Sequence, residues 1–389
     1  MGIQAGDAGL ASRLRQVVRG EVLFDAFSRG RYSTDASIYQ IEPIGVVLPA
    51  GSEDVESAIA VAREQGVAVV PRGGGSSQNG QALGAALILD TSRHMNRLLE
   101  VDTIAGTATV QPGIVLDELN RQLKPSGWYF PVDVSTSANA TIGGMTGNNS
   151  AGGRSLKYGI MVHNVLEVET VLADGARICF GELPHDLGAV PARVAELAQT
   201  LRSLYANNAA EIALHVPKLM RKVGGYNIDT LGESPQNLAK LLVGSEGTLG
   251  FFTRIKLKLH RIPKYKVSAI CHFQRFRDSM EMTRFIVELG PSAVELVDRT
   301  MLDLARQIPA FRATLERLVK GRPEALLLVE FAGDEQAPLL DHLSRLEQML
   351  ADHGYPDAVV RTVDNKSQAD MTAVRKAGLN IMMSMKGDG

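Results

Sequence analysis

The residues best suited to chemistry in this sequence fall into three clusters of glycine, hydroxyl and amide side chains. The first cluster, residues 71–80 (PRGGGSSQNG), follows the apolar run at 67–70. Glycine allows the backbone to direct successive N–H groups at one point, and serine, asparagine and arginine donate hydrogen bonds to phosphate oxygens. The pattern predicts a phosphate cradle at the end of a buried strand, with an ordinary surface turn as the alternative.

The second and third clusters occupy residues 131–159 and 244–250. The second is almost devoid of charge, and a polar, glycine-rich stretch of this length within a compact domain is typical of a binding loop. One extended ligand that contacts all three clusters would explain why each lacks bulky or charged side chains, and a dinucleotide has suitable dimensions. The first cluster matches neither the Rossmann fingerprint nor the P-loop pattern.

Four ordered motifs carry a resemblance to a known family: PRGGGSSQNG, PVDVSTSANATIGGMTGNNSAGGRSLKYG, VLADG and GSEGTLG. Together they resemble the PCMH-type FAD-binding domain of the vanillyl-alcohol-oxidase superfamily, most of all its D-2-hydroxyacid dehydrogenases of the D-lactate, glycolate and D-2-hydroxyglutarate type. Residues 92–97 (SRHMNR) further resemble long bacterial D-2-hydroxyglutarate dehydrogenase homologues, of which this chain would be an N-terminal fragment. The resemblance spans about residues 35–389 and rests on all four motifs together.

The resemblance implies FAD as the cofactor of a flavoprotein. Superfamily members that attach FAD covalently use a histidine just after the glycine loop, whereas this chain has Ser76 and Ser77 there, so noncovalent binding is expected. The first cluster would hold the diphosphate, the second would line the rest of the dinucleotide up to the flavin ring, and the third would close the flavin pocket. The expected cofactor contacts are Arg72, Gly73, Gly74, Gly75, Ser76, Ser77, Asn79, Gly80, Pro131, Ser135, Ser137, Thr141, Gly143, Gly144, Asn148, Asn149, Gly152, Gly153, Tyr158, Val165, Val168, Glu246, Gly247, Leu249 and Gly250.

Oxidation of a 2-hydroxy acid requires an anchor for the carboxylate, a base for the hydroxyl proton and a hydride acceptor. Arg375 matches the family's substrate arginine, whose planar guanidinium pairs with a carboxylate through two hydrogen bonds. A solvated cation on a helix face is the alternative for Arg375, and Lys386 is a second candidate anchor. The family's metal ligands include an H-x-H pair, which this sequence lacks. No metal site is therefore expected here, and a divalent metal and an iron–sulfur cluster are expected only in a longer parent chain.

The order of short strands and helices predicts an α+β chain in three parts. Residues 1–40 are expected as an N-terminal extension. The resemblance implies that residues 41–262 are a PCMH-type FAD-binding domain of two α+β subdomains. It also implies that residues 263–389 are the C-terminal domain of FAD-linked oxidases, a cap over the substrate, and the pattern after residue 263 fits an antiparallel sheet with helices. This cap is expected to be truncated.

Apolar periodicity predicts the elements that position these clusters. Residues 45–49 and 67–70 are expected as strands around a helix that has Ser52 as its N-cap, a β-α-β unit that leads into the first cluster. Residues 131–159 are expected to be irregular. In the cap, helices on one face of the sheet are expected at 277–289, 299–319, 335–353 and 367–385, between strands at 266–273, 293–297, 325–331 and 358–363.

Composition excludes several classes of protein. A formal net charge of -2 gives no basic footprint for nucleic acid. No apolar run is long enough for a transmembrane helix, and the N-terminus lacks the apolar core of a signal peptide. Cys179 and Cys271 have no partner at metal-binding spacing and are expected to be buried thiols in a reducing compartment. The expected location is cytoplasmic, with the periphery of the inner membrane as the alternative.

The resemblance thus implies an FAD-dependent oxidoreductase that converts a D-2-hydroxy acid, of the D-2-hydroxyglutarate or D-lactate type, into the 2-oxo acid. Hydride would pass to flavin N5, and the electrons would pass to a quinone, a cytochrome or an electron-transfer flavoprotein; a homodimer is an open option. The alternatives are an alcohol or sugar oxidase or an enolpyruvyl reductase on the same fold, a flavin-binding electron-transfer subunit, and a phosphate-binding module without redox chemistry.

Overall fold

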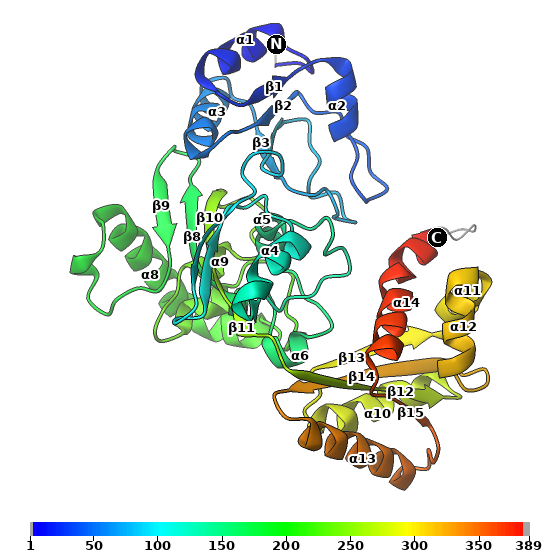
Figure 1. Ribbon diagram of the computed structural model, residues 1–389. Coiled ribbons are helices and arrows are strands. Elements are labelled where there is room, and N and C mark those ends of the chain that lie inside the picture. The colour runs from blue at the N-terminus through cyan, green and yellow to red at the C-terminus, as the bar shows by residue number, and fades with distance from the viewer. Residues whose placement is uncertain (1–2, 384–389) are drawn as a thin grey trace. The chain divides into compact units, whose positions relative to one another are not determined.

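The computed structural model describes residues 3–383, with the side chains of residues 3–375, 377 and 378. The chain forms two units (Figure 1), which we name unit 1 (residues 1–151 and 159–261) and unit 2 (residues 152–158 and 262–389). The chain therefore leaves unit 1 and returns to it within the second glycine-rich cluster. Residues 152–158 are the only part of that cluster that belongs to unit 2.

The first sheet of unit 1 contains β1 (Glu21–Leu23), β2 (Gly45–Leu48), β3 (Val69–Arg72) and β4 (Leu87–Asp90), in the order β1-β2-β4-β3. Strands β2 and β3 both run parallel to β4. The expected β-α-β unit is present, but β4 lies between its two strands. The first glycine cluster begins within β3 and continues past its carboxyl end, where ligands commonly bind in α/β sheets.

Three helices accompany this sheet: α1 (Ala8–Val17), α2 (Ala26–Tyr32) and α3 (Ser52–Glu64). The expectation that Ser52 caps α3 was wrong, because the N-cap residue is Gly51 and no side chain caps the helix. Asp54 in the first turn binds neighbouring backbone instead. Its carboxylate accepts hydrogen bonds from the N–H groups of Arg19, Gly20 and Ala50 at 3.1, 2.9 and 2.8 Å, and the residue is 1% exposed.

The second sheet of unit 1 contains β5 (Leu98–Asp102), β6 (Thr107–Val110), β8 (Val165–Val171), β9 (Arg177–Phe180) and β10 (Phe251–Lys258). Its order is β5-β6-β10-β8-β9, and every neighbouring pair is antiparallel. Along β9 the side chains alternate between exposed and buried. Cys179 lies at an exposed position of this strand, so the expectation that both cysteines are buried was wrong for Cys179 and correct for Cys271.

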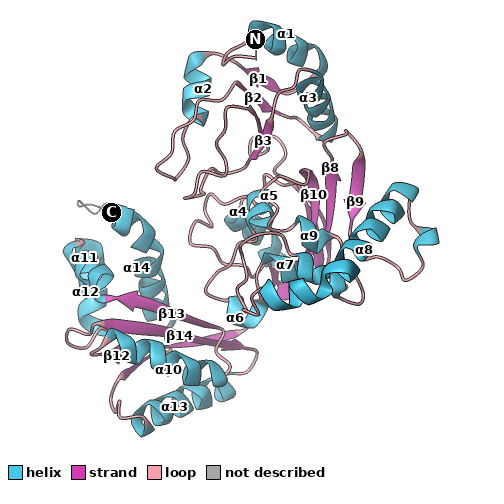
Figure 2. Ribbon diagram, turned by 180° about the vertical axis from the view of Figure 1, so that it is seen from behind, coloured by secondary structure: helices cyan, strands magenta, loops and turns pink. Residues whose placement is uncertain are grey.

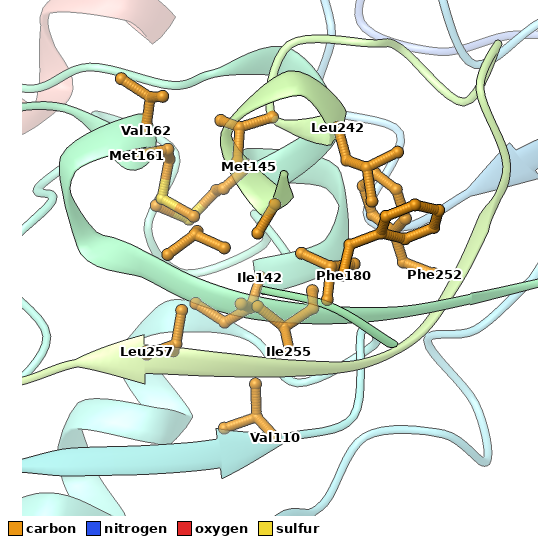
Figure 3. Close-up of a cluster of buried hydrophobic side chains, with 14 of the residues drawn as sticks. Val110, Ile142, Met145, Met161, Val162, Phe180, Leu242, Phe252, Ile255 and Leu257 are labelled. Atoms are coloured by element: carbon orange, nitrogen blue, oxygen red, sulfur yellow. The ribbon is translucent and has the colours of Figure 1, made fainter. Parts of the chain in front are cut away.

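The expectation that the second cluster is irregular was wrong in part. The cluster contains the helices α5 (Ile142–Asn148) and α6 (Ser155–Tyr158). Glycine weakens α5, but the burial of Ile142 and Met145 in the unit 1 core stabilises it. Figure 3 shows both side chains in this core with residues of the second sheet. The remaining elements of unit 1 are α4 (Leu116–Leu123), η1 (Lys124–Ser126), β7 (Trp128–Tyr129), α7 (Met161–Asn164), η2 (Leu187–Ala189), α8 (Ala192–His215), η3 (Ile228–Gly232), α9 (Ala239–Leu242) and β11 (His260–Arg261).

Unit 2 is built on an antiparallel sheet of β12 (Tyr265–Phe273), β13 (Ala293–Asp298), β14 (Ala325–Gly333) and β15 (Val359–Thr362), in the order β13-β14-β12-β15. Apolar residues follow one another directly along the central strands β12 and β14. Because successive side chains of a strand point to opposite faces, both faces of this sheet have to be covered.

Helices cover both faces of the unit 2 sheet, so the expectation of helices on one face was wrong (Figure 2). Helices α10 (Phe276–Glu288) and α13 (Gln336–Asp352) pack against one face, and α11 (Arg299–Gln307), α12 (Pro309–Leu318) and α14 (Asn365–Met383) pack on the other. The expected helix 299–319 is two helices. Pro309 begins the second, and a residue that precedes proline is disfavoured in the helical conformation.

We predict that Asp54→Asn lowers the free energy of unfolding by about 2 kcal/mol, because two carboxylate oxygens serve three backbone donors that an amide cannot all satisfy. Burial raises the pKa of Asp54, but the three N–H donors and Arg19 more than offset it and hold the pKa below its ordinary value. This stabilisation is therefore complete above the ordinary pKa of an aspartate, about 3.9, and is lost as the pH falls through the lowered pKa.

Urea unfolding of wild type and variant between pH 7 and pH 3 measures this difference, which should shrink at acidic pH. Glu53→Gln is the matched control on the same helix turn. Glu53 is 66% exposed in its ion pair with Arg19, so its removal should change stability by less than about 0.5 kcal/mol. Equal effects of the two variants at pH 7 would contradict the role of Asp54.

Candidate functional site

A cavity of about 350 Å³ in unit 1 is lined by residues from all three clusters. Three segments that are far apart in the sequence thus meet around one space. The expected residues that line it are Arg72, Gly73, Gly74, Gly75, Ser76, Ser77, Asn79, Ser135, Thr141, Gly143, Gly144, Asn148, Glu246, Gly247 and Gly250.

Other expected residues do not line this cavity. Val165 and Val168 face the hydrophobic core from β8, whereas Gly152, Gly153 and Tyr158 belong to unit 2. Gly80, Pro131, Ser137, Asn149 and Leu249 belong to unit 1 but are also absent from the cavity wall.

The cavity wall also includes residues that the motifs did not identify. Thr91 and Pro112 follow strands β4 and β6, and Phe251 and Phe252 begin β10 directly after the third cluster. All four lie at the end of a strand next to the glycine clusters, and this position is the feature of the sequence that could have identified them. Gln81, one residue beyond the first cluster, also lines the wall.

Close packing between the clusters requires glycine at residues 73, 74 and 247. A Cβ atom on Gly73 would overlap the hydroxyl of Thr141, and one on Gly74 would overlap the carbonyl oxygen of Asn139. Gly247 of the third cluster has a φ of 79°, and its Cβ would lie 2.9 Å from Cδ of Pro71. Because these contacts join the clusters, glycine sets the shape of the cavity.

Arg72 lines the cavity, but its guanidinium donates hydrogen bonds to backbone carbonyls. Its Nη2 lies 2.7 Å from the oxygen of Thr34, and its Nη1 lies 3.3 Å from that of Tyr32 and 3.4 Å from that of Ala82. The guanidinium also lies over the Tyr32 ring, 5.2 Å from its centroid. The hydroxyl of Tyr32 in turn donates to Asp90 at 2.7 Å. These contacts connect the first cluster to the segment that follows α2.

Glu246 connects the third cluster by hydrogen bonds to the second cluster and to the residue that follows the first. Its Oε1 accepts from the side-chain amides of Asn148, at 2.9 Å, and Gln81, at 3.4 Å. Burial raises the pKa of Glu246, and these two amide donors offset only part of that effect. Its φ of 50° is left-handed, which is unusual for a residue other than glycine and is typical of functional sites.

Asn149 differs from its neighbour Asn148 in being buried within unit 1. It ends α5 in the left-handed conformation, with a φ of 53°, which asparagine tolerates better than most residues. Its side-chain amide donates to the carbonyl of Lys222 at 3.2 Å and accepts from the N–H of Val162 at 3.1 Å. Asn149 therefore holds two neighbouring segments in place and is not exposed to the cavity.

Neutral donors dominate the cavity wall. Arg72 and Glu246 are the only ionisable side chains on it among the described residues. The rest of the wall consists of glycine backbone, hydroxyls, amides and apolar groups such as Val134, Met145 and Phe252. Backbone N–H groups and hydroxyls suit a diphosphate, and the apolar part suits a ring system, so these residues fit a flavin dinucleotide.

Arg375, the expected carboxylate anchor, lies on α14 in unit 2 and forms an ion pair with Glu295 of β13. The two side chains are 26% and 19% exposed. Lys386 lies outside the described residues. Within the part of the chain that is described, no group of three His, Cys, Asp or Glu residues could hold a metal. None of the described helices is long and apolar enough to cross a membrane.

Comparison with protein families identifies both parts of the chain. Residues 43–180 match the FAD binding domain family, and residues 262–388 match the C-terminal domain of FAD linked oxidases. The chain thus carries an FAD binding domain followed by the C-terminal domain of FAD linked oxidases. These matches confirm the resemblance drawn from the four motifs, the fold class and FAD as the cofactor.

The chain is 33% identical to a D-2-hydroxyglutarate dehydrogenase of Escherichia coli (strain K12), over 87% of this chain and 35% of that protein. It is 32% identical to a D-2-hydroxyglutarate dehydrogenase of Pseudomonas putida, over 95% of this chain and 38% of that protein. The chain thus spans little more than a third of the length of these relatives. It is also 29% identical to the glycolate oxidase subunit GlcD of Bacillus subtilis (strain 168), over 95% of this chain and 68% of that protein.

Solved structures share the fold of this chain. An alkyldihydroxyacetonephosphate synthase superposes with a TM-score of 0.69 at 20% sequence identity, covering 97% of this chain and 64% of that chain. At this identity the likeness concerns the fold alone.

We predict that Gly74→Ala destabilises unit 1 by about 1–3 kcal/mol. The new methyl group would overlap the backbone carbonyl of Asn139, which cannot move away by rotating a side chain. Thermal unfolding followed by circular dichroism measures the change. Gly30→Ala is the matched control, since nothing lies within 4 Å of a Cβ at this helical position. If both variants have the melting temperature of the wild type, the clusters do not pack as closely as described.

Proposed function

We propose that this chain binds FAD noncovalently in the unit 1 cavity and uses it to oxidise a D-2-hydroxy acid to the 2-oxo acid. The observation that carries the proposal is the meeting of three glycine-rich clusters around one cavity with a wall of neutral donors. Bound FAD would supply a two-electron acceptor for the hydride. The names of the relatives, D-2-hydroxyglutarate dehydrogenase and glycolate oxidase subunit, support the substrate class.

The first cluster would hold the diphosphate. The backbone N–H groups of Gly73, Gly74 and Gly75 and the hydroxyl of Ser76 lie in the cavity wall at the end of a strand. Thr141 and Gly143 belong to the facing segment of the second cluster and would contact the other side of the dinucleotide. No histidine occurs within residues 72–80, so this loop has no side chain that could form the covalent flavin bond.

Arg375 would bind the carboxylate of the acid. Its guanidinium has five N–H donors, and a carboxylate accepts two of them in parallel. An arginine that is mostly enclosed by protein gives a stronger charge-assisted hydrogen bond than an exposed one, because water competes less for the carboxylate. We infer that a separate electron acceptor, a quinone, a cytochrome or an electron-transfer flavoprotein, reoxidises the flavin.

We predict that Ser76→Asp reduces FAD binding at least about tenfold, because a fixed negative charge would lie next to the diphosphate. Purified protein is incubated with FAD, desalted, and its flavin content is measured from the absorbance near about 450 nm. Ser203→Asp on the exposed surface of α8 adds the same charge away from the cavity and should retain wild-type flavin.

If Ser76→Asp retains the flavin content of the wild type, the first cluster does not bind the diphosphate. If the wild type is colourless after incubation with FAD, the chain does not bind the flavin. The mode of attachment is read from the same preparation. Acid precipitation should leave the flavin in the supernatant, whereas a yellow pellet would show a covalent bond.

We predict that Arg375→Ala raises the KM for the hydroxy acid about 30-fold or more, which corresponds to the loss of about 2 kcal/mol from a charge-assisted hydrogen bond. FAD content should not change, since Arg375 lies in unit 2. Dye-linked turnover of D-2-hydroxyglutarate and D-lactate gives the KM, and calorimetry gives binding directly. Arg345→Ala, at a surface ion pair with Asp341 on α13, is the control; equal KM values for the two variants would contradict the assignment.

A further inference from the structure

Gly153 is a glycine of the second cluster that the cofactor cavity does not explain. It lies outside the cavity wall and within the segment of the chain that belongs to unit 2. Its backbone is not in the left-handed region, so its conformation alone does not demand glycine. A Cβ atom at this position would overlap the carboxylate Oε1 of Glu295 and would lie 2.8 Å from its Cδ. The carboxylate of Glu295 thus occupies the space that a side chain at residue 153 would fill.

The carboxylate of Glu295 is close to both Gly153 and Arg375. Its Oε1 accepts a hydrogen bond from the Arg375 guanidinium, which reaches β13 from α14, and the same oxygen lies where a Cβ of residue 153 would be. Glu295 pairs with Leu328 across the strands, and Ala293 pairs with Glu330, so both glutamates lie on the same face of the sheet. The Glu295 carboxylate is therefore in contact with an arginine at a place where the neighbouring residue has no side chain.

The segment that carries Gly153 is fixed to the sheet by the residues that follow. Arg154 forms an ion pair with Glu330 at 3.1 Å, and Lys266 lies 3.3 Å from the same carboxylate. Burial raises the pKa of Glu330, but these two cations outweigh it and hold the pKa below its ordinary value. The Nζ of Lys157 donates to the carbonyl of Ala332 at 2.6 Å. Gly153 has little freedom to move away from Glu295, since the chain next to it is anchored on β14.

We propose that Glu295 and Gly153 are positioning residues for the carboxylate anchor. Gly153 provides the space in which Glu295 lies, and Glu295 fixes the direction of the Arg375 guanidinium. This inference rests on the proposed role of Arg375 in substrate binding. A free arginine side chain samples many rotamers, and fixing it before substrate arrives removes that entropic cost from the binding step.

The carboxylates on this face of the sheet are met by cations. Glu295 is paired with Arg375, and Glu330 is paired with Arg154 and Lys266. The carboxylate of a substrate would likewise be met by the guanidinium of Arg375, which has five N–H donors.

The experiment uses the full chain loaded with FAD and three single variants. Glu295→Gln keeps the size of the side chain and removes its charge, and Gly153→Ala inserts a methyl group into the space of the carboxylate. Gly333→Ala at the end of β14 is the matched control, because a Cβ there would meet only Leu339 at 3.5 Å, an ordinary contact. The readouts are flavin content, melting temperature and the Kd for D-2-hydroxyglutarate and D-lactate by calorimetry.

We expect Glu295→Gln and Gly153→Ala to raise the Kd about tenfold, with flavin content and the Kd of Gly333→Ala at wild-type values. A positioning role also predicts non-additivity. In the Arg375→Ala background, Glu295→Gln should have no further effect, because the group that it orients is already absent. Where turnover is measured, the change should appear in KM and leave kcat within about twofold.

Three results would overturn the inference. Wild-type or tighter binding by Glu295→Gln would show that the carboxylate does not assist Arg375. An equal further loss in the Arg375→Ala background would show that Glu295 acts by another route. If Arg375→Ala itself binds both acids like the wild type, the anchor is misassigned and the proposed substrate site fails, while an unchanged flavin content would leave the cofactor assignment intact. Gly153→Ala adds support only if it folds, and Glu295→Gln decides the matter without it.

Discussion

Unit 1 depends on backbone segments that approach one another more closely than a side chain would allow. The glycines at 73 and 74 lie against residues 139–141, and Gly247 lies against Pro71. These contacts fix the directions of the N–H groups around the cavity before any ligand binds. A diphosphate would then meet donors that are already ordered, so binding would lose little conformational entropy. Glycine acts here through packing between loops as much as through conformational freedom.

The absence of a side chain also matters at Gly153, where it makes room for a carboxylate. Gly153 lies in the same glycine-rich cluster, but the group that excludes a side chain there is a carboxylate of unit 2. One continuous stretch thus contributes cavity wall up to Ala151 and then a strip that packs on the unit 2 sheet. This continuity offers a physical reason why the cluster is so long.

Much of the cavity wall could be predicted from the sequence, because a binding loop needs a composition that a core or a solvated surface does not. The sequence did not predict the roles of some individual residues. Asn148 and Asn149 are adjacent and chemically identical, and only the left-handed backbone of Asn149 turns its amide into the protein. The contact of Gly153 with Glu295 joins residues far apart in sequence, and no local pattern encodes it. By contrast, the continuous apolar residues of β12 and β14 did carry the information that both faces of the sheet are covered.

The ligands that we propose for the two units differ in size, and the groups that would bind them differ in charge. In the cavity of unit 1, Arg72 is hydrogen-bonded to carbonyls and Glu246 to amides, so an anion there would be bound mainly by N–H dipoles and hydroxyls. A dinucleotide suits such a site because many weak contacts along its length add up. A small hydroxy acid offers few contacts, and each has to be strong. Arg375, paired with the carboxylate of Glu295, would provide such a contact in unit 2. The two proposed sites therefore differ in the number and in the strength of the contacts that each ligand would make.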